Sequence, residues 1–261
     1  MDKREYCRDH EVPAGVITKA ASLSTGEVTE ADLKAINKYA LEPLSAEQVF
    51  VFRTVLCDNE IDRSYERFNL KALQDLQKLF LGKTVIKNHS WDANDQVARI
   101  YSTELVSNAN KSTQSGEAYT QLVASCYMLR TASNEDLIAE IKGGIKKEGS
   151  VGCTVTGSIC SVCGTDNVKS YCRHYPGKSY EKEGGATVCT FTLTGAKDAY
   201  EFSLVAVPAQ KAAGVCKNYT GKTVYDEETP AVAEEKSQEE DLAKELALRA
   251  RLGAARAKTN Q

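Results

Sequence analysis

Four residues of types that bind metal ions lie close together in the stretch CSVCGTDNVKSYCRH. Cys160 and Cys163 form a Cys-x-x-Cys pair, and Cys172-x-His174 follows after eight more residues. Thiolates and an imidazole at this spacing are typical ligands of tetrahedral Zn²⁺. The alternative is a set of reduced, buried cysteines without a metal. Four protein ligands leave no open coordination position, so we expect a structural zinc rather than a catalytic one.

A serine between two glycines indicates a second kind of chemistry. Ser150 lies in the stretch GSVGCTV, with Gly149 directly before it and Gly152 shortly after it. A tight turn explains this pattern. So does a nucleophile, because small neighbours leave room for a substrate carbonyl and for N–H groups that face an oxyanion. A serine hydroxyl is a weak nucleophile at neutral pH and needs an adjacent base.

Only one of the three histidines is a good candidate for that base. His10 lies in a polar N-terminal stretch, and His174 belongs to the predicted metal site. His89 follows the apolar run TVIK and lies close to the only tryptophan. A histidine at a strand end is usually a surface or hydrogen-bonded residue. The functional interpretation is a general base, since imidazole titrates near neutral pH.

A carboxylate in an apolar strand completes the candidates for catalysis. Alternation in AYEFSLV puts Glu201 and Ser203 on one face of the strand, with Tyr200, Phe202 and Leu204 on the other. A carboxylate in such a strand is costly unless it is paired. Glu201 is therefore either an edge-strand surface residue or the group that orients a histidine. Ser203 competes as a nucleophile, but its apolar strand predicts poor access.

Strands and helices alternate along the chain that must position these residues. Strand patterns lie at 49–56, on both sides of a loop within 85–106, and at 119–129, 149–157 and 200–207. Three helices are predicted: one capped by Thr29 and ended by Pro43, one with an apolar stripe from Leu70 to Phe80, and one capped by Asn134. This order predicts an α+β fold with a β-barrel-like, mainly antiparallel sheet, flanking helices and a small zinc-binding insert.

The composition divides the chain into three parts. Residues 1–45 form a polar segment with a short helix, and residues 46–220 form the main domain, with the Cys/His insert at 157–189. Residues 221–261 are rich in Ala, Glu, Lys and Arg, and we expect a charged tail that is helical or disordered. The tail is either solvated or a docking helix for a partner or a second copy of the chain.

Bulk properties exclude several classes of function. The net charge of −3 gives no reason to expect direct nucleic-acid binding. The first residues lack the apolar core of a secretory signal, and no window approaches 18 apolar residues, so we expect neither secretion nor a membrane span. In the reducing cytoplasm that this predicts, nine cysteines indicate metal binding or burial rather than disulfides. Cys153 and Cys189, which flank the insert, could pair with each other in the sheet or substitute as metal ligands, but we expect small core residues.

Three blocks of the sequence resemble the prohead (capsid-maturation) serine proteases of tailed bacteriophages, distant relatives of the herpesvirus assemblins. The blocks GKTVIKNHSWDANDQVARIY, IKKEGSVGCTV and AYEFSLVAVPAQKAA stand in the family's order. They carry a His, a Ser-x-Gly and an acidic residue before Ser-Leu-Val. The resemblance covers about residues 48–216, apart from the Cys/His insert. It implies a compact barrel-like protease domain with Ser150 as nucleophile, His89 as base and Glu201 as third member.

The sequence departs from the family pattern in two places. The family often has Gly before the Arg of its first block, whereas this chain has Val97-Ala98-Arg99. Arg99 supports either the oxyanion or a salt bridge, and we expect the salt bridge. The Cys/His insert also lengthens the path from Ser150 to Glu201.

The function implied by this resemblance is that of a phage serine endopeptidase of the Ser-His-Glu type. It would cleave segments of the scaffold protein and the major capsid protein, and itself, during capsid maturation. The setting would be the assembling procapsid in the host cytoplasm, with self-association there. The alternative is a non-catalytic, zinc-stabilised phage head-assembly protein. A zinc-dependent hydrolase is a third hypothesis, which a coordinatively full site disfavours.

Overall fold

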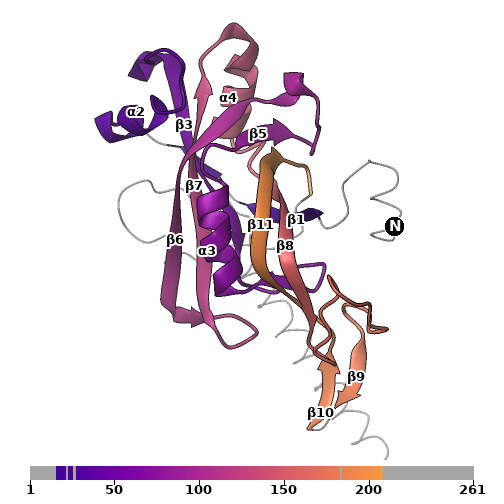
Figure 1. The fold of residues 1–261 in the computed structure, drawn as a ribbon. Coiled ribbons are helices and arrows are strands. Elements are labelled where there is room, and N and C mark those ends of the chain that lie inside the picture. The colour runs from indigo at the N-terminus through magenta and orange to yellow at the C-terminus, as the bar shows by residue number, and fades with distance from the viewer. Residues whose placement is uncertain (1–15, 22, 26–27, 183, 208–261) are drawn as a thin grey trace, which may run out of the picture. The chain divides into compact units, whose positions relative to one another are not determined.

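A computed structural model describes residues 16–21, 23–25, 28–182 and 184–207 (Figure 1). These residues belong to one compact unit. His10 and the predicted charged tail at 221–261 lie outside the described residues. No helix in the described part of the chain has the length and apolar character needed to cross a membrane.

The fold is α+β with a mainly antiparallel sheet, which confirms the predicted class. Among the described residues, nine strands form the main sheet in the order β1-β8-β11-β5-β6-β7-β3-β2, and β4 pairs with β11. Only the pairings of β11 with β4 and with β5 are parallel. The strands are β1 Val16–Ala21, β2 Leu23–Thr25, β3 Val49–Asp58, β4 Glu66–Phe68, β5 Thr84–Lys87, β6 Ala98–Ser112, β7 Ala118–Leu129, β8 Gly149–Cys160 and β11 Phe191–Leu204.

Within the described residues the sheet is an open path and not a closed barrel, whereas a barrel-like sheet was predicted. Its end strands β1 and β2 do not pair with each other within the described residues. They are nevertheless consecutive in the chain, with only residue 22 between them. The sheet therefore curls until its two ends approach each other.

Three α-helices accompany the sheet in the described residues: α2 Glu30–Ile36, α3 Leu70–Leu79 and α4 Glu135–Lys142. The predicted Thr29 cap of α2 is confirmed, with Asp32 completing a capping box. The helix ends well before Pro43, because the Asn37 side chain bonds the backbone of Leu44 and turns the chain.

Two details of the predicted helices are wrong. Leu70 is 49 % exposed, so the buried stripe of α3 begins at Leu73 and not at Leu70. Asn134 precedes α4 but does not cap it, because its side-chain amide donates to the carbonyl of Leu129. A short 3₁₀ turn, Ala132–Asn134, leads into α4 instead.

The main core lies between one face of the sheet and helices α3 and α4 (Figure 1). Each fully buried large apolar side chain there contributes roughly 1.5–3 kcal/mol. Its large, fully buried members come from both layers: Phe50, Phe52, Leu56, Phe68, Leu73, Leu76, Phe80, Ile100, Leu122 and Phe202. A second cluster packs Ile36 of α2 against Val49, Val51, Tyr101 and Tyr127.

The long antiparallel pair β8–β11 carries the candidate site. The pairing runs from Phe191 opposite Cys160 to Leu204 opposite Gly149, with two register shifts along it. Strand β11 therefore begins nine residues before the predicted Tyr200 and ends before Val207. The Cys/His insert leaves the far end of this pair and contains the hairpin β9 Ser179–Lys182 and β10 Gly185–Val188 (Figure 1).

Candidate functional site

The ends of three neighbouring strands bring the predicted catalytic residues together at one end of the sheet. His89 follows β5, which runs parallel to β11 with Ser203 opposite Ile86. Strand β8 runs antiparallel to β11, with Ser203 opposite Ser150. The end of β5, the end of β11 and the start of β8 therefore meet, although the residues are far apart in sequence.

His89 and Glu201 are in direct contact. His89 Nδ1 lies 2.8 Å from Glu201 Oε1, and the two side chains are 15 % and 5 % exposed. Glu201 lies on a central strand, so the alternative of an edge-strand surface carboxylate is wrong. When the neutral imidazole donates its Nδ1–H to the carboxylate, Nε2 remains as an acceptor. That is the form a general base requires.

The turn after β5 fixes the position of His89. Asn88 and His89 both have left-handed backbone conformations, with φ values of 52° and 55°. The Asn88 N–H donates to Leu204 O at 2.9 Å, and the His89 N–H donates to Ser203 Oγ at 2.7 Å. Strand β11 therefore holds both the backbone of His89 and its carboxylate partner.

Ser150 lies beside this pair. Its residue is 4 % exposed. Its position directly opposite Ser203 puts both side chains on one face of the sheet, with Cβ atoms about 4.5–5.5 Å apart. Within the described residues no hydrogen bond joins Ser150 to His89. The structure thus joins two members of the predicted triad and places the third on the neighbouring strand.

The glycines around Ser150 have a packing role that the sequence analysis did not foresee. A Cβ on Gly152 would lie 2.4 Å from Glu201 Oε1, and a Cβ on Gly149 would lie 2.1 Å from the Phe202 ring. Such distances are too short for any side chain. The glycines therefore make room for Glu201 and Phe202.

Tyr200 lies on the same face as the candidate site, which corrects the predicted alternation. A register shift between Ala199 and Glu201 interrupts the alternation just before Glu201. The Tyr200 hydroxyl lies 2.7 Å from Thr154 Oγ1, and its ring meets Trp91 edge-on at a centroid distance of 5.9 Å. In the sequence, the one signal for this aromatic pair is that the single tryptophan lies two residues after His89.

Arg99 bonds a backbone carbonyl in place of the carboxylate that we expected. Its guanidinium Nη1 donates to the carbonyl of Gly82 at 2.7 Å. Within the described residues it has no ion pair. Arg99 therefore secures the end of the α3 loop, and the predicted salt bridge is absent from the described part of the chain.

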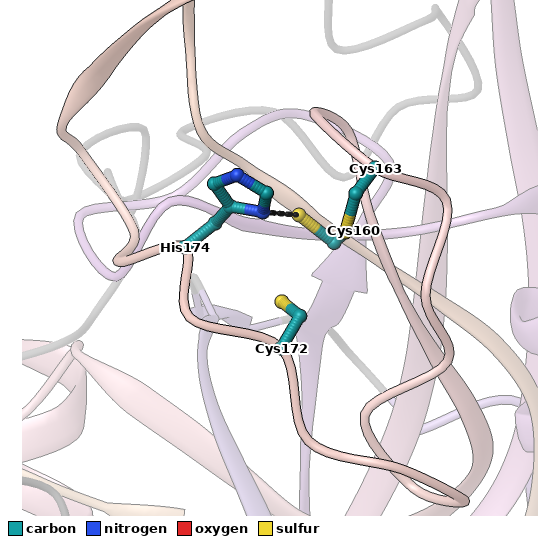
Figure 2. Close-up of side chains that lie close together, drawn as sticks. All are labelled: Cys160, Cys163, Cys172 and His174. Carbon is teal, nitrogen blue, oxygen red and sulfur yellow. Dashed lines mark hydrogen bonds between the residues drawn. The ribbon is translucent and has the colours of Figure 1, made fainter.

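A separate cluster of Cys160, Cys163, Cys172 and His174 is positioned to bind a metal ion (Figure 2). One ligand atom from each residue lies within 4.8 Å of the others, and Cys160 Sγ lies 3.7 Å from His174 Nδ1. Metal–ligand bonds of about 2.0–2.3 Å in tetrahedral geometry separate the ligand atoms by roughly 3.5–3.8 Å. The four residues fit a single ion.

The cysteines of this cluster, and Cys189 beside it, differ in their environment. A hydrogen bond with the Thr165 hydroxyl lowers the pKa of the exposed Cys163 thiol to about 6. Burial raises the pKa of Cys172, and burial followed by the contact with Cys160 raises the pKa of Cys189 to about 12. Cys163 is thus more easily ionised than Cys172 or Cys189.

The two flanking cysteines are buried, as predicted. Cys153 belongs to the main core. Cys189 packs in the small core of the insert with Phe191, and its sulfur lies 3.9 Å from that of Cys160. No disulfide joins any two of the cysteines that the structure describes.

The chain matches no protein-family model, no curated protein and no solved structure. A relationship to the prohead proteases therefore stays a hypothesis. The sequence blocks that suggested it coincide with the strand ends described above.

Proposed function

We propose that this protein is a serine endopeptidase of the Ser-His-Glu type. Ser150 is the nucleophile, His89 the general base, and Glu201 the carboxylate that orients the base. The observation that supports this most is the 2.8 Å contact between His89 Nδ1 and Glu201 Oε1, formed by residues 112 positions apart. A buried carboxylate that bonds an imidazole, with a serine nearby, is the arrangement that acyl-transfer chemistry uses.

The proposed reaction follows from these roles. Ser150 Oγ attacks the scissile carbonyl carbon while His89 Nε2 takes its proton, and Glu201 stabilises the imidazolium. The C–N bond breaks as the imidazolium returns this proton to the leaving amine, which leaves an acyl group on Ser150. A water molecule, deprotonated by the same imidazole, then attacks the ester carbonyl; the C–Oγ bond breaks, the imidazolium returns the proton to Ser150 Oγ, and the carboxylic acid leaves. The Nε2–Oγ hydrogen bond forms in the substrate complex, as is common for catalytic contacts that are open without substrate.

We further infer that the enzyme acts in capsid maturation of a tailed bacteriophage. Its substrates would be the scaffold protein, the major capsid protein and its own chain, inside the assembling procapsid in the host cytoplasm. The order of the three sequence blocks supports this assignment. The curled sheet would then be an open counterpart of the family's barrel.

Co-expression with the phage's capsid and scaffold proteins tests the activity. Wild-type chain should cleave them, while Ser150→Ala and His89→Ala should lower the cleavage rate by at least about 1,000-fold. Ser158→Ala is the matched control, because Ser158 lies on the same strand and at the ladder position opposite Leu193. Unchanged cleavage with Ser150→Ala would exclude Ser150 as the nucleophile.

One observation favours the alternative of a non-catalytic head-assembly protein. No hydrogen bond joins Ser150 to His89 in the described residues. Under this alternative, the Ser150→Ala chain supports head assembly as well as the wild type does, and neither chain cleaves the capsid or scaffold proteins.

We propose that the metal of the Cys/His cluster is a structural Zn²⁺ held by Cys160, Cys163, Cys172 and His174. Purified protein should contain about one zinc per chain. Cys172→Ser should remove most of it, whereas Cys126→Ala should not, because Cys126 lies in the main core. A zinc content well below one per chain would count against the four-ligand site.

A further inference from the structure

Ser203 is a buried hydroxyl in an apolar part of strand β11. The residue is fully buried, between Phe202 and Leu204, which are 0 % and 4 % exposed. A buried hydroxyl is costly unless it forms hydrogen bonds. Ser203 Oγ accepts one from the His89 backbone N–H at 2.7 Å, across 114 positions of sequence.

The residue that donates this hydrogen bond is in an uncommon conformation. His89 has φ of 55° and follows Asn88, which has φ of 52°. Left-handed backbone costs free energy for residues other than glycine, and it persists only where surrounding contacts impose it. Here two consecutive residues of β11 supply those contacts, Ser203 through its hydroxyl and Leu204 through its carbonyl.

The same strand therefore controls both ends of the His89–Glu201 contact. Glu201 and Ser203 are two residues apart on β11, and their side chains lie on the same face. Glu201 holds the imidazole of His89 at Nδ1, and Ser203 holds the backbone N–H of the same residue. The distance between base and carboxylate is thus set by a short piece of one strand.

We propose that Ser203 is a positioning residue for His89. By accepting the His89 N–H, its hydroxyl keeps the backbone left-handed, so that Nδ1 meets Glu201 and Nε2 remains the acceptor. Its effect on catalysis rests on the proposed protease function, whereas its effect on the imidazole does not. Both serines are buried, but the Ser203 hydroxyl is engaged by the His89 N–H, and Ser150 carries the chemistry.

The test compares Ser203→Ala with Ser203→Thr, which keeps an acceptor oxygen. The matched control is Thr54→Val, which removes another buried strand hydroxyl, one that contacts the neighbouring carbonyl of Val55. The first readout is the low-field proton NMR signal of His89 Nδ1–H bonded to a carboxylate, assigned by its loss in Glu201→Gln. The second readout is the kinetics of substrate cleavage.

Ser203→Ala should abolish or shift the Nδ1–H signal and lower kcat about 10- to 100-fold with KM little changed, since orientation of the base is lost. Ser203→Thr should restore both readouts towards the wild type, and Thr54→Val should change neither. A Ser203→Ala protein that keeps the signal and kcat would overturn the proposal.

Two further results keep the inference separate from the proposed function. If the wild type cleaves nothing but Ser203→Ala still loses the Nδ1–H signal, the protease proposal fails and the positioning role stands. If Ser203→Ala does not fold, hydrogen exchange of the wild-type His89 amide decides. Protection of that amide comparable to the β11 ladder supports the hydrogen bond, and fast exchange contradicts it.

Discussion

Glu201 can lie against His89 because residue 152 has no side chain. Gly152 is directly opposite Glu201 in the β8–β11 ladder, and an added Cβ would lie 2.4 Å from Glu201 Oε1. The ladder holds both backbones, so the carboxylate is the group that must move. At this position a single methyl group is enough to separate the base from its acid.

Gly152→Ala should therefore inactivate the proposed enzyme. We expect cleavage to fall by at least about 100-fold because the imidazole loses its oriented carboxylate. Overpacking should also lower the free energy of unfolding by about 1–3 kcal/mol. Cleavage assays and thermal denaturation measure the two effects.

Gly143→Ala at the end of α4 is the control for adding a methyl group to a glycine. There the new Cβ meets the carbonyl of Ala139 at 3.2 Å and touches no group of the candidate site. Full activity of Gly152→Ala would show that Glu201 does not act through His89.

The sequence predicted the residues of the site better than their contacts. Scarcity of histidine singled out His89, and the cost of a carboxylate in an apolar strand singled out Glu201. The role of Ser203 was missed because a hydrogen bond to a distant backbone N–H leaves no pattern in the sequence. The position of Tyr200 was wrong because a bulge depends on the pairing of two strands.

Among the secondary-structure elements, α2 is held to the sheet in part by one half-buried carboxylate, that of Asp32. Asp32 accepts hydrogen bonds from Thr29 within its own capping box and from the Tyr101 hydroxyl of β6 at 2.7 Å. Burial raises the pKa of Asp32, but the bonds from Tyr101 and Thr29 outweigh it and lower the pKa below its ordinary value of 3.8. The carboxylate therefore stabilises the fold only while it is ionised.

Tyr101→Phe should lower the free energy of unfolding by about 1 kcal/mol at pH 7, since one hydrogen bond to a carboxylate is lost. A depressed pKa stabilises the fold above the unfolded pKa, and this contribution disappears as the pH falls through the folded pKa. The difference between variant and wild type should therefore shrink below about pH 4. Denaturant titrations at several pH values measure it.

Tyr127→Phe is the matched control for this prediction. Tyr127 belongs to the same cluster as Tyr101, but the hydroxyl that bonds Asp32 is that of Tyr101. The difference in unfolding free energy between Tyr127→Phe and the wild type should therefore stay the same above and below pH 4. An equal acid response in both variants would contradict the role of Asp32.

The Cys/His insert is the element that depends most on its ligand. Its small core consists mainly of Cys160, Cys172, Cys189 and Phe191, with the rest of the segment polar. So little apolar burial does not offset the entropy of ordering a segment of this length. The metal should supply the remainder.

Chelation should therefore speed hydrogen exchange in residues 160–190 by at least about tenfold, while strands β6 and β7 keep their protection. Restoring Zn²⁺ should restore slow exchange. Unchanged exchange after confirmed metal loss would show that the insert folds without a metal.

Elements with strong local signals were predicted well and the others were not. The apolar stripe of α3 and the Thr29 box of α2 need only nearby residues. The first half of β11 was missed, because Thr, Gly, Lys and Asp there do not read as a strand without β8 beside them. Strands β1 and β2 were missed for the same reason.

On the scale of the whole molecule, one pair of strands connects two separate sites. Strand β8 carries Ser150 at its start and Cys160 at its end, and β11 runs from the metal cluster towards Glu201. Two register shifts on β11 lie between these ends. Bulges absorb local changes in pairing, so the ends should respond independently.

The proposed peptidase should therefore survive removal of its metal. We expect chelated protein to keep its cleavage rate within about threefold, because every proposed catalytic group belongs to the protein. The His89 Nδ1–H signal should also persist. A metal-dependent hydrolase would instead lose its activity in proportion to the zinc removed.

The fold class followed from composition and element order, but the closure of the sheet did not. Whether the sheet closes depends on how β1 and β2 pair at its two ends, and neither strand has a distinctive pattern. The positions of strands relative to one another are long-range properties that one sequence does not encode locally.

The pairing of Cys160 with Phe191 has a practical consequence for engineering. Because these two residues face each other across adjacent strands, about 5 Å apart, the thirty residues between them form, in topological terms, a hairpin loop. A short hairpin turn between the two strands would take their place. The shortened chain would be a compact scaffold for grafting other binding loops at the end of β8–β11 that lies opposite the candidate active site.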